Sequence, residues 1–117
     1  MPSDKPVQRL NDILENIYRI VQYTHDQTLD AFKQDWLTRD AVERCLLRIS
    51  EAARKLEGIV DEIASDQPWA DIRALGNVIR HDDDAVDPEV IWKIVEKDLL
   101  PLETALRAAI EKIERKS

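Results

Sequence analysis

Hydrophobic residues recur along most of the chain at steps of three and four positions, the spacing of one face of an α-helix. We expect a first amphipathic helix over residues 5–25 and a second that is capped by Thr38 and runs to residue 63. A third stripe begins after Pro68, and a fourth runs from Pro88 to Lys112. The four stripes are Val7, Leu10, Leu14, Ile17 and Val21; Val42, Leu46, Ile49, Ala53, Leu56, Val60 and Ile63; Trp69, Ile72, Leu75 and Ile79; and Ile91, Val95, Leu99, Leu102, Leu106 and Ile110.

Breaks in this pattern predict how the helices connect. Between the first two stripes, we expect Phe32 and Trp36 to pack a short helical turn onto the bundle. Asp87 should cap the last helix, and Pro101 should kink or split it. No segment alternates with the period of a strand, so the chain (1–117) is predicted to be one all-α domain, an antiparallel bundle of four to five helices.

Composition narrows the protein class. No apolar run has the length of a membrane span or a signal peptide, which favours a cytoplasmic protein and no membrane role. The single cysteine, Cys45, excludes an internal disulfide and a cysteine-rich zinc site, and its apolar neighbours predict a buried thiol. With a net charge of −7, the chain can bind nucleic acid only at a local basic patch.

The stretch GNVIRHDDD, residues 76–84, carries the most chemistry. Helical spacing places Arg73, Asn77, Arg80 and His81 on one polar, cationic side, and Gly76 borders that side. A glycine inside a helix costs about 1 kcal/mol relative to alanine, which indicates close approach of another group or neutral drift.

Simpler interpretations of this stretch stay open. Arg80 and His81 also suit a helix C-terminus, where cations interact favourably with the carbonyl end of the helix dipole. The aspartates that follow could be a solvated loop. A metal site of His81, Asp82, Asp84 and Asp87 is conceivable, but the run lacks the glycine and closing glutamate of a calcium loop. No nucleophile or phosphate-loop motif is present, and no cofactor is expected.

The arrangement as a whole resembles a known family. The segments that carry the resemblance are DILENIYRIVQYT (12–24), DAVERCLLRISEAARKL (40–56), PWADIRALGNVIRHDDDAVD (68–87) and DLLPL (98–102). Together they look like the HepT-like branch of the HEPN superfamily. The resemblance implies a homodimeric all-α bundle, and a toxin that acts as a metal-independent endoribonuclease on RNA. It also implies a partner, a minimal nucleotidyltransferase that serves as the antitoxin.

The family motif R-N-x-x-x-H-x-Y assigns candidate site residues. Asn77 and His81 match it, whereas Gly76 stands at the arginine and Asp83 at the tyrosine. One branch reads G-N-x-x-R-H-x-Y, which Arg80 matches. The catalytic candidates are therefore His81 as acid and base, Arg80 as charge stabiliser and Asn77 as the orienting group.

The departures from the motif leave two functions open. Arg73, which lies on the same helix face as His81, is a second substitute for the missing arginine. Gly76 and Asp83 count as auxiliary positions. The first function is the toxin ribonuclease. The alternative is a catalytically degenerate HEPN module that dimerises and binds a nucleotidyltransferase. The resemblance also implies that the nucleotidyltransferase silences the nuclease by adenylylating the motif tyrosine. Asp83 stands at that position and has no phenolic hydroxyl to accept the nucleotide.

Overall fold

The structure is a computed structural model that describes residues 5–81 and 86–116. Every element in those ranges is a helix, as the hydrophobic pattern predicts. The elements are α1 (Pro6–Thr24), α2 (Leu29–Gln34), α3 (Trp36–Lys55), α4 (Val60–Ile63), α5 (Trp69–His81), α6 (Pro88–Lys93), the π-helix η2 (Ile94–Asp98) and α7 (Leu99–Lys116).

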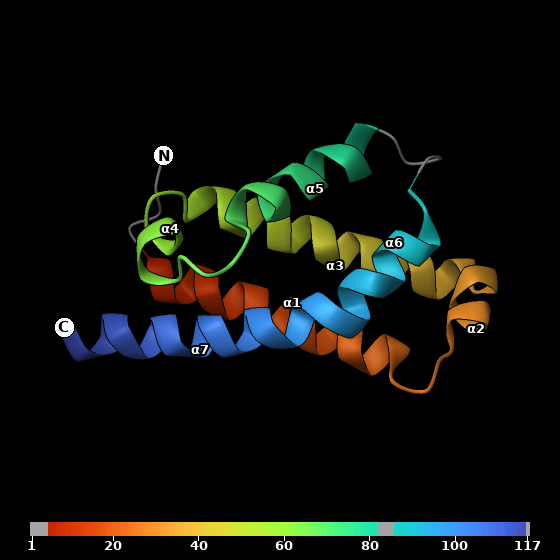
Figure 1. Ribbon diagram of the computed structural model, residues 1–117, viewed down its shortest axis with the longest axis horizontal. Coiled ribbons are helices and arrows are strands. Elements are labelled where there is room, and N and C mark those ends of the chain that lie inside the picture. Colours follow the sequence, from red (N-terminus) through yellow and green to blue (C-terminus); the bar gives the residue numbers. More distant parts are fainter. Residues whose placement is uncertain (1–4, 82–85, 117) are drawn as a thin grey trace.

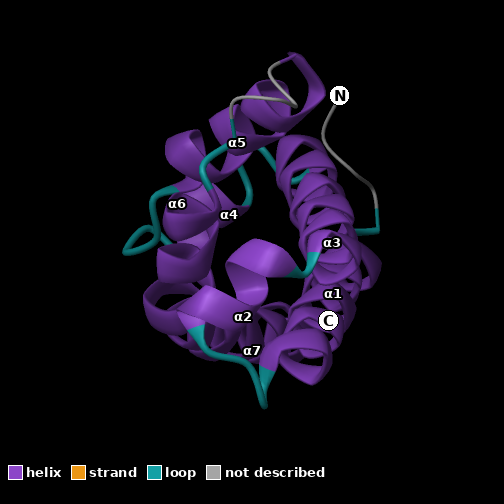
Figure 2. Cartoon of the chain, turned by 90° about the vertical axis from the view of Figure 1, so that its right-hand side faces the viewer, coloured by secondary structure: helices purple, strands orange, loops and turns teal. Residues whose placement is uncertain are grey.

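The long helices form an antiparallel bundle. In Figure 1, α1 runs from left to right, α3 returns, α5 runs out again, and α6, η2 and α7 lead back to the left. Helices α1 and α7 lie side by side along the lower edge, while α5 packs on α3 at the upper edge. The end view in Figure 2 shows the helices arranged around a common centre. The predicted all-α fold is confirmed.

The core lies where the stripes of α1, α3 and α7 meet. Leu10 and Ile17 of the first predicted stripe are buried, but Val21 is 43% exposed. The fully buried residues of α1 also include Ile13 and Ile20, so the buried face is rotated from the predicted one. The predicted stripe and the buried one are both apolar and lie side by side on α1, and packing against α3 buries the one that contains Ile13 and Ile20.

The predicted second helix is wrong at both ends. It begins after Asp35 rather than Thr38, because the Asp35 carboxylate accepts the Thr38 backbone N–H at 3.0 Å. It ends at Lys55 rather than residue 63, and Gly58 then takes a positive φ of 88°. Val60 stays fully buried because the short helix α4 turns it back onto the core. The hydrophobic stripe therefore continues although the helix does not.

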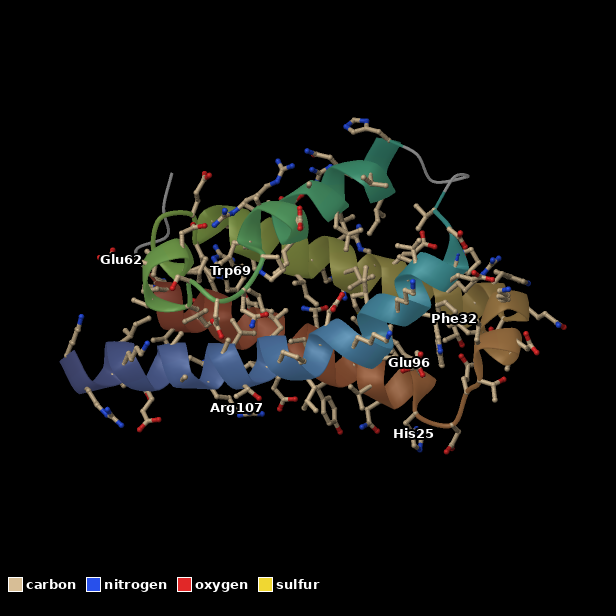
Figure 3. The ribbon with its side chains drawn as sticks, viewed as in Figure 1. His25, Phe32, Glu62, Trp69, Glu96 and Arg107 are labelled. Carbon is tan, nitrogen blue, oxygen red and sulfur yellow. The ribbon has the colours of Figure 1, made fainter. Side chains whose placement is uncertain are left out.

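The two aromatic residues of the first connection have opposite fates. Phe32 of α2, labelled in Figure 3, is fully buried, which confirms the prediction for Phe32. Its ring centroid lies 5.2 Å from that of Trp92. The prediction for Trp36 is wrong, since its side chain is 64% exposed. Asp35 already ends α2 and caps α3, so Trp36 becomes the first residue of a new helix and turns to solvent.

Pro101 interrupts the last helix, as predicted. A proline has no backbone N–H to donate to the carbonyl four residues earlier, here that of Lys97. Just before α7 the chain forms the π-helix η2, in which backbone hydrogen bonds span five residues instead of four. At the start of α6, the Asp87 carboxylate accepts the Glu89 backbone N–H at 2.9 Å, and Pro88 is the first helical residue. The predicted cap is confirmed.

Candidate functional site

Three of the predicted site residues gather in the last two turns of α5. Asn77, Arg80 and His81 are all exposed there. The Arg80 guanidinium donates from Nη2 to the Asn77 side-chain oxygen at 2.7 Å. The side chain of His81, the last residue of the helix, makes no hydrogen bond to a described residue, and the residue is exposed to solvent.

Helix α3 adds two charged residues that the sequence did not reveal. Arg54 donates a second hydrogen bond to the Asn77 oxygen, and Glu51 forms an ion pair with Arg80. The Asn77 amide is thus held between two guanidinium groups. Glu51 and Arg54 are three positions apart and share one face of α3, but nothing local in the sequence connects that face to α5.

Gly76 has a packing role at the crossing of α3 and α5. The buried Ser50 hydroxyl accepts the Gly76 backbone N–H at 3.1 Å and donates to the Arg73 carbonyl at 2.9 Å. A Cβ on Gly76 would lie 2.2 Å from the Ser50 oxygen, well inside van der Waals contact. Close approach of another group is therefore the reason for this glycine, and neutral drift is not needed.

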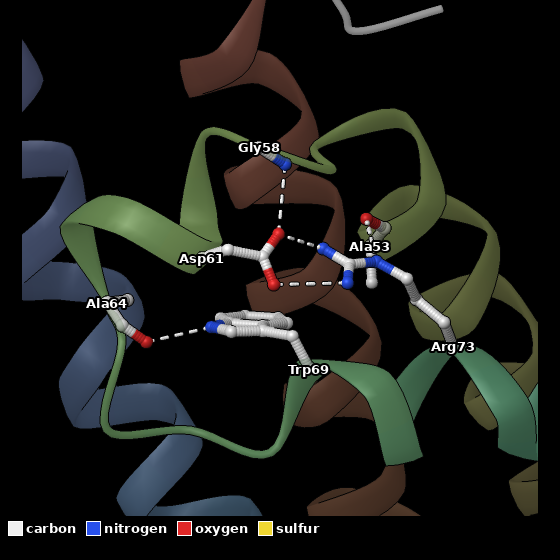
Figure 4. Close-up of polar contacts among 6 residues, drawn as sticks. All are labelled: Ala53, Gly58, Asp61, Ala64, Trp69 and Arg73. Carbon is white, nitrogen blue, oxygen red and sulfur yellow. Dashed lines mark hydrogen bonds and ion pairs between the residues drawn. The ribbon is translucent and has the colours of Figure 1, made fainter.

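Arg73 contacts residues of α3 and α4, and Figure 4 shows these contacts. Its guanidinium forms a two-pronged ion pair with Asp61, at 3.1 and 2.6 Å, and its Nε donates to the Ala53 carbonyl at 3.1 Å. The hydrogen bond from Arg73, followed by that from the Gly58 backbone N–H, lowers the pKa of Asp61. These contacts tie α5 to the end of α3 and to α4, so the Arg73 side chain stabilises the packing of three helices.

The remaining candidate positions fall outside the described part of the chain or have ordinary roles. Asp83, with Asp82 and Asp84, lies outside the described residues. Among residues 5–81 and 86–116, no three metal-ligating side chains come together.

The other histidine, His25, pairs with Asp26 at 3.2 Å at the end of α1 (Figure 3). Within the same ranges, no helix is both long and apolar enough to cross a membrane.

Together, these features define a class of protein. It is a small all-α bundle in which one helix end presents a histidine, an asparagine and an arginine, with a second arginine supplied by the neighbouring helix. Such a cluster can bind a phosphate through its guanidinium groups and move a proton through its imidazole.

Comparison with known proteins identifies the family. The model of the family described as ribonuclease HepT-like matches residues 13–113, and the chain belongs to that family. It is therefore a HEPN-type ribonuclease by family, as the resemblance predicted.

Individual relatives agree with this assignment. The chain is 35% identical to a candidate RNase of Methanocaldococcus jannaschii over 81% of this chain and 78% of that protein. It is 32% identical to a second candidate RNase of that organism over 77% and 83% of the two chains. It is 28% identical to a protein of Thermococcus cleftensis named probable ribonuclease HepT, over 91% and 93%. No solved structure matches the chain.

Proposed function

We propose that this chain is the toxin of a toxin–antitoxin pair and cuts RNA as a metal-independent endoribonuclease. The observation that carries the proposal is the grouping of Asn77, Arg80 and His81 at the exposed end of α5, in a chain of the HepT-like ribonuclease family. Supporting evidence comes from the relatives, whose names describe RNases.

The chemistry follows from the residue types. His81 removes the proton of an RNA 2′-hydroxyl, and the oxygen attacks the adjacent phosphorus. Negative charge builds on the phosphoryl oxygens, where the Arg80 guanidinium stabilises it. The 5′-oxygen leaves and takes a proton from a second acid. The products are a 2′,3′-cyclic phosphate and a 5′-hydroxyl, with no metal or cofactor needed.

The second acid comes from a second copy of the chain. We propose a homodimer in which two α5 ends face one cleft, because a twofold axis turns one histidine into an acid and a base. Arg80 takes the place of the motif arginine. Its guanidinium donates to the Asn77 side-chain oxygen in this structure, which orients it before a phosphate arrives.

The antitoxin is a minimal nucleotidyltransferase, and both proteins act in the cytoplasm, where their RNA substrate is. Because Asp83 replaces the motif tyrosine, we propose that the partner silences this toxin by binding it rather than by transferring a nucleotide to that position.

The proposed activity is tested with purified protein on mixed tRNA and mRNA in EDTA. We compare the wild type with His81→Ala, and with His25→Ala as the matched control, since His25 is the other exposed histidine. The wild type and His25→Ala should cut and leave cyclic-phosphate ends, and His81→Ala should not. Equal cutting by His81→Ala, or loss of cutting in EDTA, would contradict the mechanism.

A second function is favoured by one observation. The ion pair with Glu51 already occupies Arg80, and Gly76 stands where the family motif has its arginine. A chain without a free arginine at the site suits a catalytically degenerate module that dimerises and binds a nucleotidyltransferase. This module would be folded and dimeric, bind its partner, and leave RNA intact in every variant. If the wild type cleaves RNA and His81→Ala does not, the degenerate module is rejected.

A further inference from the structure

A groove between α1 and α3 gathers a large share of the positive charge of an acidic protein. The groove encloses about 720 Å³ and reaches Arg80 at the end of α5. Six of the 17 Lys and Arg residues of the chain line it, beside only three acidic residues, although the whole chain carries −7. Its cations are Arg9, Arg19, Arg44, Arg48, Lys55 and Arg80.

Half of these cations have no ion-pair partner among the residues that the structure describes. Arg9, Arg19 and Arg80 pair with Asp12, Glu15 and Glu51. In contrast, Arg44, Arg48 and Lys55 are exposed on α3 and form no ion pair or side-chain hydrogen bond with any described residue. Arg44 and Arg48 are one helical turn apart, where like charges destabilise a helix. No ion pair among the described residues offsets this repulsion.

The wall of the groove also contains an unpaired acceptor. Asn16 is only 8% exposed, and its side-chain nitrogen donates to the Asp12 carbonyl at 2.8 Å. Its side-chain oxygen is buried and has no hydrogen-bond partner within the described residues. A buried oxygen of this kind is uncommon, and a hydroxyl donor from a ligand would satisfy it. A ribose 2′-hydroxyl is such a donor.

We propose that this α1–α3 groove binds the sugar–phosphate backbone of single-stranded RNA and leads it to His81, an inference that rests on the proposed ribonuclease function. The free cations of α3 bind successive phosphates, and the Asn16 oxygen accepts a ribose hydroxyl. Arg80 belongs both to the groove and to the cluster with Asn77, so a strand in the groove reaches the cluster without a break. A flexible single strand suits a groove of this kind, because its backbone can follow a line of cations.

The test measures RNA binding separately from cleavage. All proteins carry His81→Ala, so that RNA stays intact, and are titrated with a labelled oligouridylate at several salt concentrations. The groove variant adds Arg44→Ala and Arg48→Ala. The control adds Arg107→Ala and Arg115→Ala, which remove the same charge from α7, outside the groove. Circular dichroism and thermal unfolding verify that both variants fold.

We expect the groove variant to bind about tenfold more weakly and its salt dependence to fall by about 1.4, since each phosphate contact on a single strand contributes about 0.7. The control should bind as the parent does. An oligodeoxyuridylate should bind the parent more weakly than the oligouridylate, because it lacks the 2′-hydroxyl.

Two results would contradict RNA binding in the groove. One is equal RNA affinity of all three proteins, and the other is an equal loss of affinity in the groove variant and the control. The unpaired cations would then face an acidic protein partner instead. This result can be told apart from that of the cleavage test. If RNA binding depends on the groove but the wild type cleaves no RNA, the groove is supported and the nuclease is rejected. If the wild type cleaves RNA but binding does not depend on the groove, the nuclease is supported and the groove is rejected.

Discussion

The hydroxyl of Ser50 joins α3 to the backbone of α5 at Gly76, where it accepts the Gly76 N–H at 3.1 Å. The same hydroxyl donates to the Arg73 carbonyl one turn earlier, at 2.9 Å. This contact sets how closely the two helices approach. Because they approach closely, Glu51 and Arg54, which follow Ser50 on α3, reach Arg80 and Asn77 on α5. The glycine at the family's arginine position therefore serves the geometry of the cluster.

Replacing this glycine should destabilise the protein. We expect Gly76→Ala to lower the free energy of unfolding by about 1–3 kcal/mol, because the new Cβ overlaps Ser50 in a packed crossing. At an open helical site the same change is stabilising by about 1 kcal/mol, so the sign of the effect is diagnostic. Urea denaturation measures it.

A paired substitution isolates the cause. The two closest atoms to that Cβ both belong to the Ser50 side chain, so Gly76→Ala should no longer destabilise a protein that carries Ser50→Gly. If Gly76→Ala costs the same free energy with and without the serine, the close approach is not the reason for the glycine.

The ion pair between Asp61 and Arg73 should make stability depend on pH at the acidic end. The folded protein lowers the pKa of Asp61 below its ordinary 3.8, mainly through the Arg73 hydrogen bond. A lowered folded pKa adds stability that is complete above the unfolded pKa and is lost as the pH falls through the folded value. We therefore expect Asp61→Asn to be less stable than the wild type at pH 7, with the difference shrinking as the pH falls below 3.8 and vanishing only below the lowered folded pKa.

Denaturation curves over a pH series measure this difference. Asp66→Asn serves as the control, since Asp66 is exposed and forms no ion pair with a described residue. A gap between wild type and Asp61→Asn that persists unchanged in acid would argue against the ion pair as its source.

Removing the acid that pairs with Arg80 should strengthen RNA binding. Glu51 competes with a phosphate for the guanidinium, and exposed ion pairs contribute about 0.2–1 kcal/mol. With His81→Ala present to prevent cleavage, Glu51→Gln should raise affinity for an oligouridylate about two- to fivefold. Glu103→Gln makes the same charge change beside Arg107 on α7 and should leave affinity unchanged. Weaker binding by Glu51→Gln would mean that Glu51 holds Arg80 in place for RNA.

The lone cysteine should be inert in the folded protein. Cys45 is 2% exposed, and burial raises the pKa of its thiol, which leaves less of the reactive thiolate. We expect Ellman's reagent to label Cys45 only as fast as the protein unfolds. The Tyr18→Cys variant, with a thiol at a 60% exposed position of α1, should add one rapidly labelled group. Rapid labelling of the wild type would place Cys45 in reach of solvent.

The sequence by itself determined much of the fold and the position of the candidate site. Helical periodicity, the Asp87 cap and the interruption at Pro101 could all be predicted from the sequence, because each depends on residues within a turn or two. The same local logic placed Asn77 and His81 one turn apart at the end of one helix. Their catalytic roles, and that of Arg80, stay predictions.

Tertiary structure decided the rest. The rotation of α1 that exposes Val21, the turn at Gly58 and the outward position of Trp36 each reflect packing between segments. In the site, Arg73 and Arg80 share a helix, yet Asp61 holds one and Glu51 the other. The partners of Arg80 and Asn77 on α3 are 29 and 23 positions away. Contacts at that separation depend on how two helices cross, which a single sequence read turn by turn does not specify.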